Sequence, residues 1–166
     1  EKIIKVLGEI KDINWQVFSK HTKKEYAVKN IHIRPINNEA FIESFINCTG
    51  VLCGAGFETP AEALFLKKKL MVIPMKGQYE QQCNAAALQT MSVPVIKSLK
   101  KKHLDTIRDW VATDQHIIVN YPDTTQRIIN MIIKKHGHAD NKKTAAPAYA
   151  VYSIKKLKEK SLGKIL

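Results

Sequence analysis

Strand-like and helix-like segments alternate through the middle of this chain, and that alternation constrains the fold more than any other feature. The apolar runs at residues 50–53 and 70–74 are typical of buried strands, and helical patterns follow them at residues 59–68 and 79–91. Each helical crossover returns the chain to the same edge of a sheet, so the strands must be parallel. We therefore predict an α/β fold with three α/β/α layers and a mostly parallel sheet.

The flanking segments extend this pattern. Further helices are expected at residues 2–10, 39–47, 103–113 and 123–135, and further strands at residues 14–19, 31–34, 93–96 and 117–120. Asn37 or Asn38 offers an N-cap for one helix and Asp123 for another, whereas the lysine-rich residues 20–29 are interpreted as a solvated loop. A doubly wound sheet normally begins with its central strand, so we expect that strand to lie upstream of residue 1.

Positive charge is unevenly distributed along the chain. Lysine and arginine number 27 against 15 acidic residues, a net charge of +12, which attracts phosphorylated ligands, anionic lipid or nucleic acid. Residues 134–166 hold nine of the lysines, and the composition changes after Gly137. We predict a folded domain over residues 1–137 and a basic linker and tail over residues 138–166. The tail is either a solvated terminus or a segment that docks on an anionic membrane.

Several classes of protein are disfavoured by composition. The three cysteines, Cys48, Cys53 and Cys83, contain no C-x-x-C pair and form no even-numbered disulfide framework, which favours a reducing cytoplasmic setting. No run approaches the roughly 18 apolar residues of a membrane-spanning helix, and there is no signal-peptide pattern at the N-terminus. The six histidines are scattered, so we expect no metal site.

The turn after the first buried strand carries the sharpest chemical signal. Gly54 and Gly56 allow the main chain to approach an anion closely, and the helix that follows offers free N–H groups and a positive end. The Thr59 hydroxyl adds a donor. The same segment also reads as a capping box, with Thr59 as N-cap, Pro60 in the first helical position and Glu62 reaching back. Both interpretations remain open at this point.

The turn after the second buried strand has residues that suit a sugar. Its helix begins with a carboxylate and several amides, namely Gln78, Glu80, Gln81, Gln82 and Asn84. Sugar hydroxyls both donate and accept hydrogen bonds, which carboxylates and amides match. The alternative is a polar helix start in which Glu80 complements the helix dipole.

Taken together, the two turns resemble the C-terminal domain of GT-B glycosyltransferases, especially the bacterial group related to the peptidoglycan N-acetylglucosaminyltransferase and the UDP-glucuronosyltransferases. The resemblance covers residues 30–91, and more loosely residues up to 135, and rests on residues 54–62, 69–74 and 80–84. It implies that residues 1–137 are a Rossmann-like nucleotide-sugar-binding domain, the C-terminal half of a GT-B fold. The first strand and the N-terminal acceptor domain are expected to be missing.

The resemblance also implies roles for individual residues. Gly56 and Thr59 would contact the diphosphate, Glu62 the ribose hydroxyls, and the backbone of the loop from Arg34 to Ile36 the base. The family often has His or Arg before the phosphate-binding glycine, where this chain has Gly54 and Ala55, so backbone amides are expected to stabilise the diphosphate.

For the donor sugar, the resemblance implies that Glu80 and Gln81 hold the hydroxyls and that Asn84 supports their turn. The complete set of expected substrate-binding residues is Ile36, Gly54, Gly56, Phe57, Thr59, Glu62, Gln78, Glu80, Gln81 and Asn84. The catalytic base of inverting members lies in the N-terminal domain, so no catalytic residue is expected in this chain.

The expected activity is therefore hexosyl transfer from a nucleotide-diphosphate sugar, with UDP-sugar favoured, to an acceptor hydroxyl, without a metal or other cofactor. The acceptor is unknown, nucleic acid is not an expected partner, and the cytoplasmic face of a membrane is an expected location. Two alternatives stay open. One is an isomerase like the nucleotide-sugar 2-epimerases, which share the architecture, and the other is a non-enzymatic basic module that binds nucleic acid or membrane.

Overall fold

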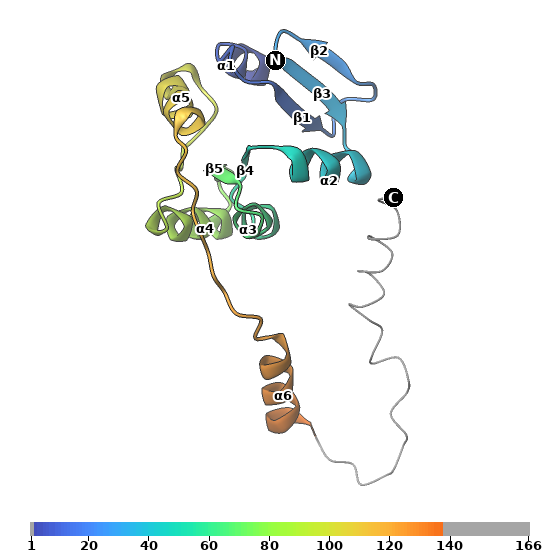
Figure 1. The fold of residues 1–166 in the computed structure, drawn as a ribbon, viewed down its shortest axis with the longest axis vertical. Helices are drawn as coiled ribbons and strands as arrows, with labels where there is room; N and C mark the ends of the chain where they lie inside the picture. The colour runs from blue at the N-terminus through green and yellow to red at the C-terminus, as the bar shows by residue number, and fades with distance from the viewer. Residues whose placement is uncertain (1, 138–166) are drawn as a thin grey trace. The chain divides into compact units, whose positions relative to one another are not determined.

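The computed structural model describes residues 2–137, which belong to two units divided between Tyr121 and Pro122 (Figure 1). The first unit contains, in order, α1 (Lys2–Leu7), β1 (Trp15–Ser19), β2 (Tyr26–Val28), β3 (Ile31–Pro35), α2 (Asn38–Asn47), β4 (Gly50–Gly54), α3 (Glu58–Phe65), β5 (Lys69–Ile73), α4 (Tyr79–Thr90), the 3-10 turn η1 (Lys101–His103) and α5 (Leu104–Ala112). The second unit contains α6 (Thr125–His136).

The strands pair mainly in parallel, as predicted. β1 is parallel to β3, and β4 is parallel to β5 in a register that sets Gly54 opposite Ile73. The strand expected at residues 93–96 is reduced to an isolated parallel bridge between Val95 and Val72. β2 is the exception: it pairs antiparallel with β3, on the side of β3 opposite β1.

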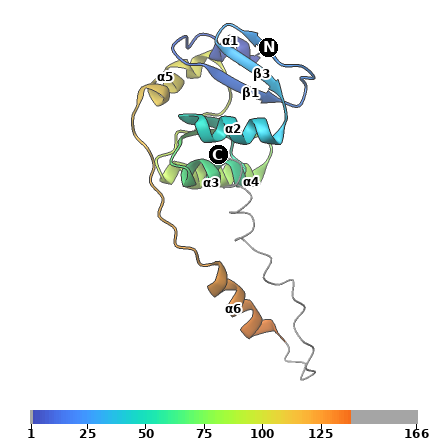
Figure 2. The ribbon, with the colours of Figure 1, turned by 45° about the vertical axis from the view of Figure 1, so that its right-hand side comes forward.

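Helices cover both faces of β5, which gives the predicted three layers. Leu70 and Val72 pack in one cluster with buried residues of α2, α3 and α4, whereas Met71 packs in another with residues of α1 and α5. This alternation follows from the period of two along a strand. Full burial of side chains of this size stabilises the fold by roughly 1.5–3 kcal/mol each. Figure 1 shows α3 and α4 on one side of β4 and β5, with α1 and α5 on the other, and Figure 2 shows the same two pairs of helices apart from a second direction.

A third cluster joins the two sheets. Leu7 of α1 packs with Ile31 and Ile33 of β3, and Leu52 of β4 lies against the same cluster. Trp15 contacts both this cluster and the one around Met71. The two sheets therefore share one continuous interior.

Two predicted segments are wrong. The lysine-rich loop at residues 20–29 contains β2, because Lys29 and Asn30 form a tight turn, with φ of 56° at Lys29, that pairs Val28 with Ile31. The strand predicted at residues 117–120 does not form. A 2.8 Å hydrogen bond between His116 Nδ1 and the Lys67 carbonyl oxygen instead holds the start of this segment against the end of α3. The side chains of Ile117 and Val119 pack against the core without strand pairing.

The second unit, considered by itself, holds an amphipathic helix. Its apolar residues Ile128, Ile129, Met131, Ile132 and Ile133 are 43–63% exposed, and its last turn carries Lys134, Lys135 and His136. The N-cap is Thr124, and the Asp123 carboxylate accepts a hydrogen bond from the Thr125 N–H, which lowers the pKa of Asp123. The two units divide before α6, and the predicted tail at residues 138–166 lies outside the described residues. A domain over residues 1–137 stays a prediction.

Candidate functional site

The two glycine-bearing turns lie at the same edge of one strand pair. β4 and β5 are parallel neighbours whose last residues, Gly54 and Ile73, are paired, so both turns leave from the carboxyl ends. α3 follows the first turn and α4 the second, and the two helices lie side by side on one face (Figure 1). The carboxyl edge of parallel strands is where ligands bind in open α/β sheets.

Side-chain amides on α4 hold the two turns together. Asn84 Nδ2 donates to the Ala55 carbonyl oxygen at 3.1 Å and lies 3.5 Å from Glu80 Oε1. Gln81 Oε1 accepts from the Met75 N–H at 2.9 Å and would lie 3.5 Å from a Cβ added at Gly54. These hydrogen bonds bring the two turns together at one edge of the sheet, and they use part of the hydrogen-bonding capacity of Gln81 and Asn84.

Gln78 and Glu80 lie on the outer side of this arrangement. Gln78 is the N-cap residue of α4 and accepts from Gln81 Nε2 through its Oε1 at 2.8 Å. Both Gln78 and Glu80 are exposed, so the Glu80 carboxylate faces solvent beside the Asn84 amide. A carboxylate next to an amide on the first turn of a helix can receive two hydroxyl groups of a ligand.

The capping-box interpretation of the first turn is wrong. α3 begins at Glu58, with Phe57 as its N-cap in the right-handed helical region and no side-chain cap bond. Thr59 is thus the second helical residue and Pro60 the third, and Glu62 is the fifth, two positions beyond the N3 position from which a capping-box glutamate reaches back. β4 continues through Gly54 and α3 begins at Glu58, so the turn between them is shorter than the sequence pattern implied. Thr59 is half-buried and Glu62 is exposed.

Open space lies where a side chain at Gly56 would point. A Cβ there would meet no heavy atom within 4 Å, and the residue does not adopt a positive φ. Neither packing nor backbone conformation within the described residues therefore requires glycine at this position. Phe57, the next residue, is 75% exposed. The surface above this turn thus has room for an occupant and an apolar side chain beside it.

Glu62 also belongs to a second feature of the same helix. A groove of about 780 Å³ runs between α2 and α3, with mostly apolar walls that include Phe45 and Leu64. Among the predicted site residues, Glu62 alone lines it. The turns around Gly56 and Glu80 form an open surface outside this groove.

Ile36 lies apart from these two turns in the sequence, in the loop between β3 and α2. Its side chain is 66% exposed. The loop ends at Asn37, whose Oδ1 accepts from the Ala40 N–H at 2.9 Å and caps α2, as predicted. Ile36 therefore lies at the carboxyl end of β3, in a loop with a fixed exit.

Sequence reasoning missed two residues of the second turn. Lys76 is an exposed cation between β5 and α4, and Gly77 has φ of 80°, a conformation that favours glycine. A lysine beside a glycine in a strand-to-helix turn is the signal that points to them. Next to them, Tyr79 shares a hydrogen bond with the Cys83 thiol, which raises the pKa of the Tyr79 hydroxyl.

The described residues contain neither a metal-binding cluster nor a membrane-spanning helix. Within residues 2–137, no three His, Cys, Asp or Glu side chains gather in a way that could hold a metal ion. No helix of that same part of the chain has the length and apolar character needed to cross a membrane. That the reaction needs no metal stays a prediction.

Comparison with known proteins identifies the family. A family model described as glycosyl transferase family 1 matches residues 1–113, which include both turns and the β3–α2 loop. Comparisons with curated proteins and with solved structures found no match. A glycosyltransferase takes a sugar from a nucleotide-sugar donor and passes it to an acceptor. The chain belongs to glycosyl transferase family 1, and residues 1–113 are a glycosyltransferase domain of that family.

Proposed function

We propose that this chain is the donor-binding half of a glycosyltransferase that uses a UDP-sugar and transfers a hexosyl group to an acceptor hydroxyl. The hydrogen bond from Asn84 to Ala55 is the observation that carries the proposal, because it joins the two turns at one edge of the sheet. The relationship to the peptidoglycan N-acetylglucosaminyltransferase group is part of this proposal.

The first turn supplies the diphosphate site. The first N–H groups of a helix have no intrahelical acceptor, and the helix dipole adds partial positive charge, so the start of α3 attracts an anion. The open space at Gly56 supports a close approach of phosphate oxygens to the main chain. Thr59 adds a hydroxyl, and Lys76 supplies the cation that is missing before Gly56. These groups stabilise the departing diphosphate during transfer.

The second turn supplies the sugar site. Glu80 accepts hydrogen bonds from two neighbouring hydroxyls, and Gln81 offers its remaining amide hydrogen. Asn84 and Gln78 orient this pair through the bonds described above. Glu62 binds the ribose hydroxyls, and the loop at Ile36 reads the base.

The acceptor and the catalytic base belong to the N-terminal half of the complete enzyme in this proposal. That base removes the proton from the acceptor hydroxyl while the groups of this chain stabilise the leaving diphosphate. We propose that no divalent metal takes part and assign no catalytic residue in this chain.

A calorimetric titration tests the proposal. The chain is titrated with UDP, GDP, ADP, UDP-sugars and inorganic pyrophosphate, and we expect UDP and UDP-sugars to bind at least about tenfold more tightly than the others. Absence of binding by every nucleotide would refute it. With the complete enzyme, analysis of the products separates transfer to an added acceptor from epimerisation of the donor sugar.

We also propose that the C-terminal part of the chain brings the domain to the cytoplasmic face of an anionic membrane. The exposed apolar residues of α6 and its basic last turn support this, since interfacial helices combine these two features. Vesicles of phosphatidylglycerol and phosphatidylcholine test it by co-sedimentation. The full chain should bind anionic vesicles in a salt-sensitive manner, and a chain ending at residue 121 should not. Equal binding by the two chains contradicts the proposal.

A further inference from the structure

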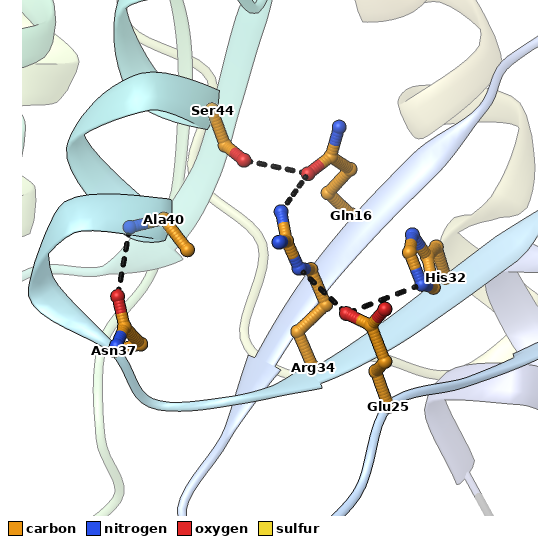
Figure 3. Close-up of polar contacts among 7 residues, drawn as sticks. All are labelled: Gln16, Glu25, His32, Arg34, Asn37, Ala40 and Ser44. Carbon is orange, nitrogen blue, oxygen red and sulfur yellow. Dashed lines mark hydrogen bonds and ion pairs between the residues drawn. The ribbon is translucent and has the colours of Figure 1, made fainter.

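The loop between β3 and α2 is braced at its entry by Arg34. The Arg34 guanidinium lies 3.3 Å from Glu25 Oε2 through Nε and donates from Nη1 to Gln16 Oε1 at 3.5 Å. Its Cζ lies 5.8 Å from the centre of the Phe18 ring, in a cation–π contact. The side chain is 26% exposed. One arginine thus connects the end of β3 to β1 and to the segment before β2 (Figure 3).

The same contacts continue across β1 into α2, on the other side of the loop. Gln16 Oε1 also accepts from the Ser44 hydroxyl on α2 at 2.6 Å (Figure 3). In parallel, the Phe18 ring packs edge-on against Phe41 of α2, with centroids 5.3 Å apart. A polar path and an aromatic path therefore both run from Arg34 through β1 to α2.

The loop consequently has both ends fixed. Arg34 holds the entry, and the Asn37 cap on the Ala40 N–H holds the exit. Between them stands Ile36, an apolar side chain that is largely exposed. A loop with restrained ends loses less conformational entropy when a ligand binds, which raises affinity without adding a contact.

We infer that Arg34 is a positioning residue that holds the β3–α2 loop in its binding conformation for the nucleoside part of the donor. The inference rests on the proposed function, in which this loop reads the base. Arg34 acts through the loop and does not itself contact the diphosphate. Its loss should therefore weaken ligands that carry a base and leave ligands without one unchanged.

The test compares UDP with inorganic pyrophosphate by calorimetry on the full chain. Arg34→Ala should weaken UDP binding by about tenfold and change pyrophosphate binding by less than about twofold. Arg34→Lys should give an intermediate UDP affinity, because lysine keeps the charge beside Glu25 and loses the planar guanidinium. Arg108→Ala is the matched control: Arg108 pairs with Asp105 at 3.0 Å on α5, and its loss should change neither affinity.

Amide hydrogen exchange provides the second readout. Exchange at Ile36 and Asn37 should become faster in Arg34→Ala and stay unchanged in Arg108→Ala. The inference is overturned if Arg34→Ala binds UDP like the wild-type chain, loses UDP and pyrophosphate affinity equally, or leaves exchange in the loop unaltered. A wild-type chain that binds no nucleotide would instead refute the proposed function, and the positioning role would fall with it.

Discussion

The side-chain amide of Asn84 donates a 3.1 Å hydrogen bond to the main-chain carbonyl oxygen of Ala55, 29 residues earlier in the chain. This bond connects α4 to the turn that precedes α3 and so joins the diphosphate and sugar subsites proposed above. Asn84 is half-buried and Ala55 is fully buried. Removal of this one hydrogen bond should affect both the stability of the domain and its affinity for the donor.

Asn84→Ala should lower the free energy of unfolding by about 1–2 kcal/mol, because the Ala55 carbonyl loses its partner in a largely buried position. UDP-sugar affinity should fall by at least about tenfold, since the two turns are no longer held together. Denaturant titration and calorimetry measure the two effects. Asn47→Ala is the control, as Asn47 Nδ2 donates to the Glu43 carbonyl oxygen within α2 at 2.9 Å. An equal loss of affinity in both variants would contradict the role of Asn84.

Gly56→Ala should separate binding from stability. The added methyl group meets nothing in the protein, so the free energy of unfolding should stay constant or rise by up to about 1 kcal/mol. Affinity for UDP should fall, because the methyl group occupies the space proposed for phosphate. Gly50→Ala is the opposite case: its Cβ would lie 3.1 Å from Trp110 Cζ2, and overpacking should cost about 1–3 kcal/mol. Unchanged UDP affinity in Gly56→Ala would argue against a phosphate at this turn.

Glu62→Ala tests the ribose contact. Since α3 begins at Glu58 and has no side-chain cap bond, removal of the Glu62 carboxylate should change the free energy of unfolding by less than about 0.5 kcal/mol. UDP affinity should decrease by about tenfold. Glu58→Ala, in the first turn of the same helix, is the control and should not reduce affinity, because it removes a negative charge near the diphosphate. Reduced stability with unchanged affinity would restore a structural role for Glu62.

The cysteines should differ in reactivity. Burial raises the pKa of the Cys53 thiol from 9.0 to about 12, whereas Cys83 is exposed on α4. At pH 8, iodoacetamide should modify Cys83 first and reach Cys53 only on unfolding, as followed by peptide mass spectrometry. The stability contributed by the neutral Cys53 thiol is complete below pH 9 and falls as pH rises toward 12, because the unfolded chain ionises first. Rapid modification of Cys53 in the folded chain would contradict its burial.

Much of the fold was predictable because it depends on local periodicity. Alternating apolar runs and helical patterns placed β4, α3, β5 and α4 within a few residues, and the parallel pairing followed from the crossovers between them. Asn37 was predictable as an N-cap because its hydrogen bond reaches only three residues along the chain. The two turns were singled out for the same reason, since glycine next to a helix start is a local signal.

What the sequence could not decide depends on partners far away along the chain. β2 forms because Val28 pairs with Ile31 across a tight turn, whereas residues 117–120 form no strand and Ile117 and Val119 only pack against the core.

The same reason explains the site. The sequence by itself determined which residues follow the ends of strands: Gly56 and Glu80 after two of them, and Ile36 after a third. Only the tertiary structure decided that Asn84 reaches Ala55 and that Arg34 reaches Gln16, because these hydrogen bonds join residues 29 and 18 positions apart. Local side-chain patterns are fixed by the periodicity of helices and strands, whereas contacts of this length exist only once the core has packed.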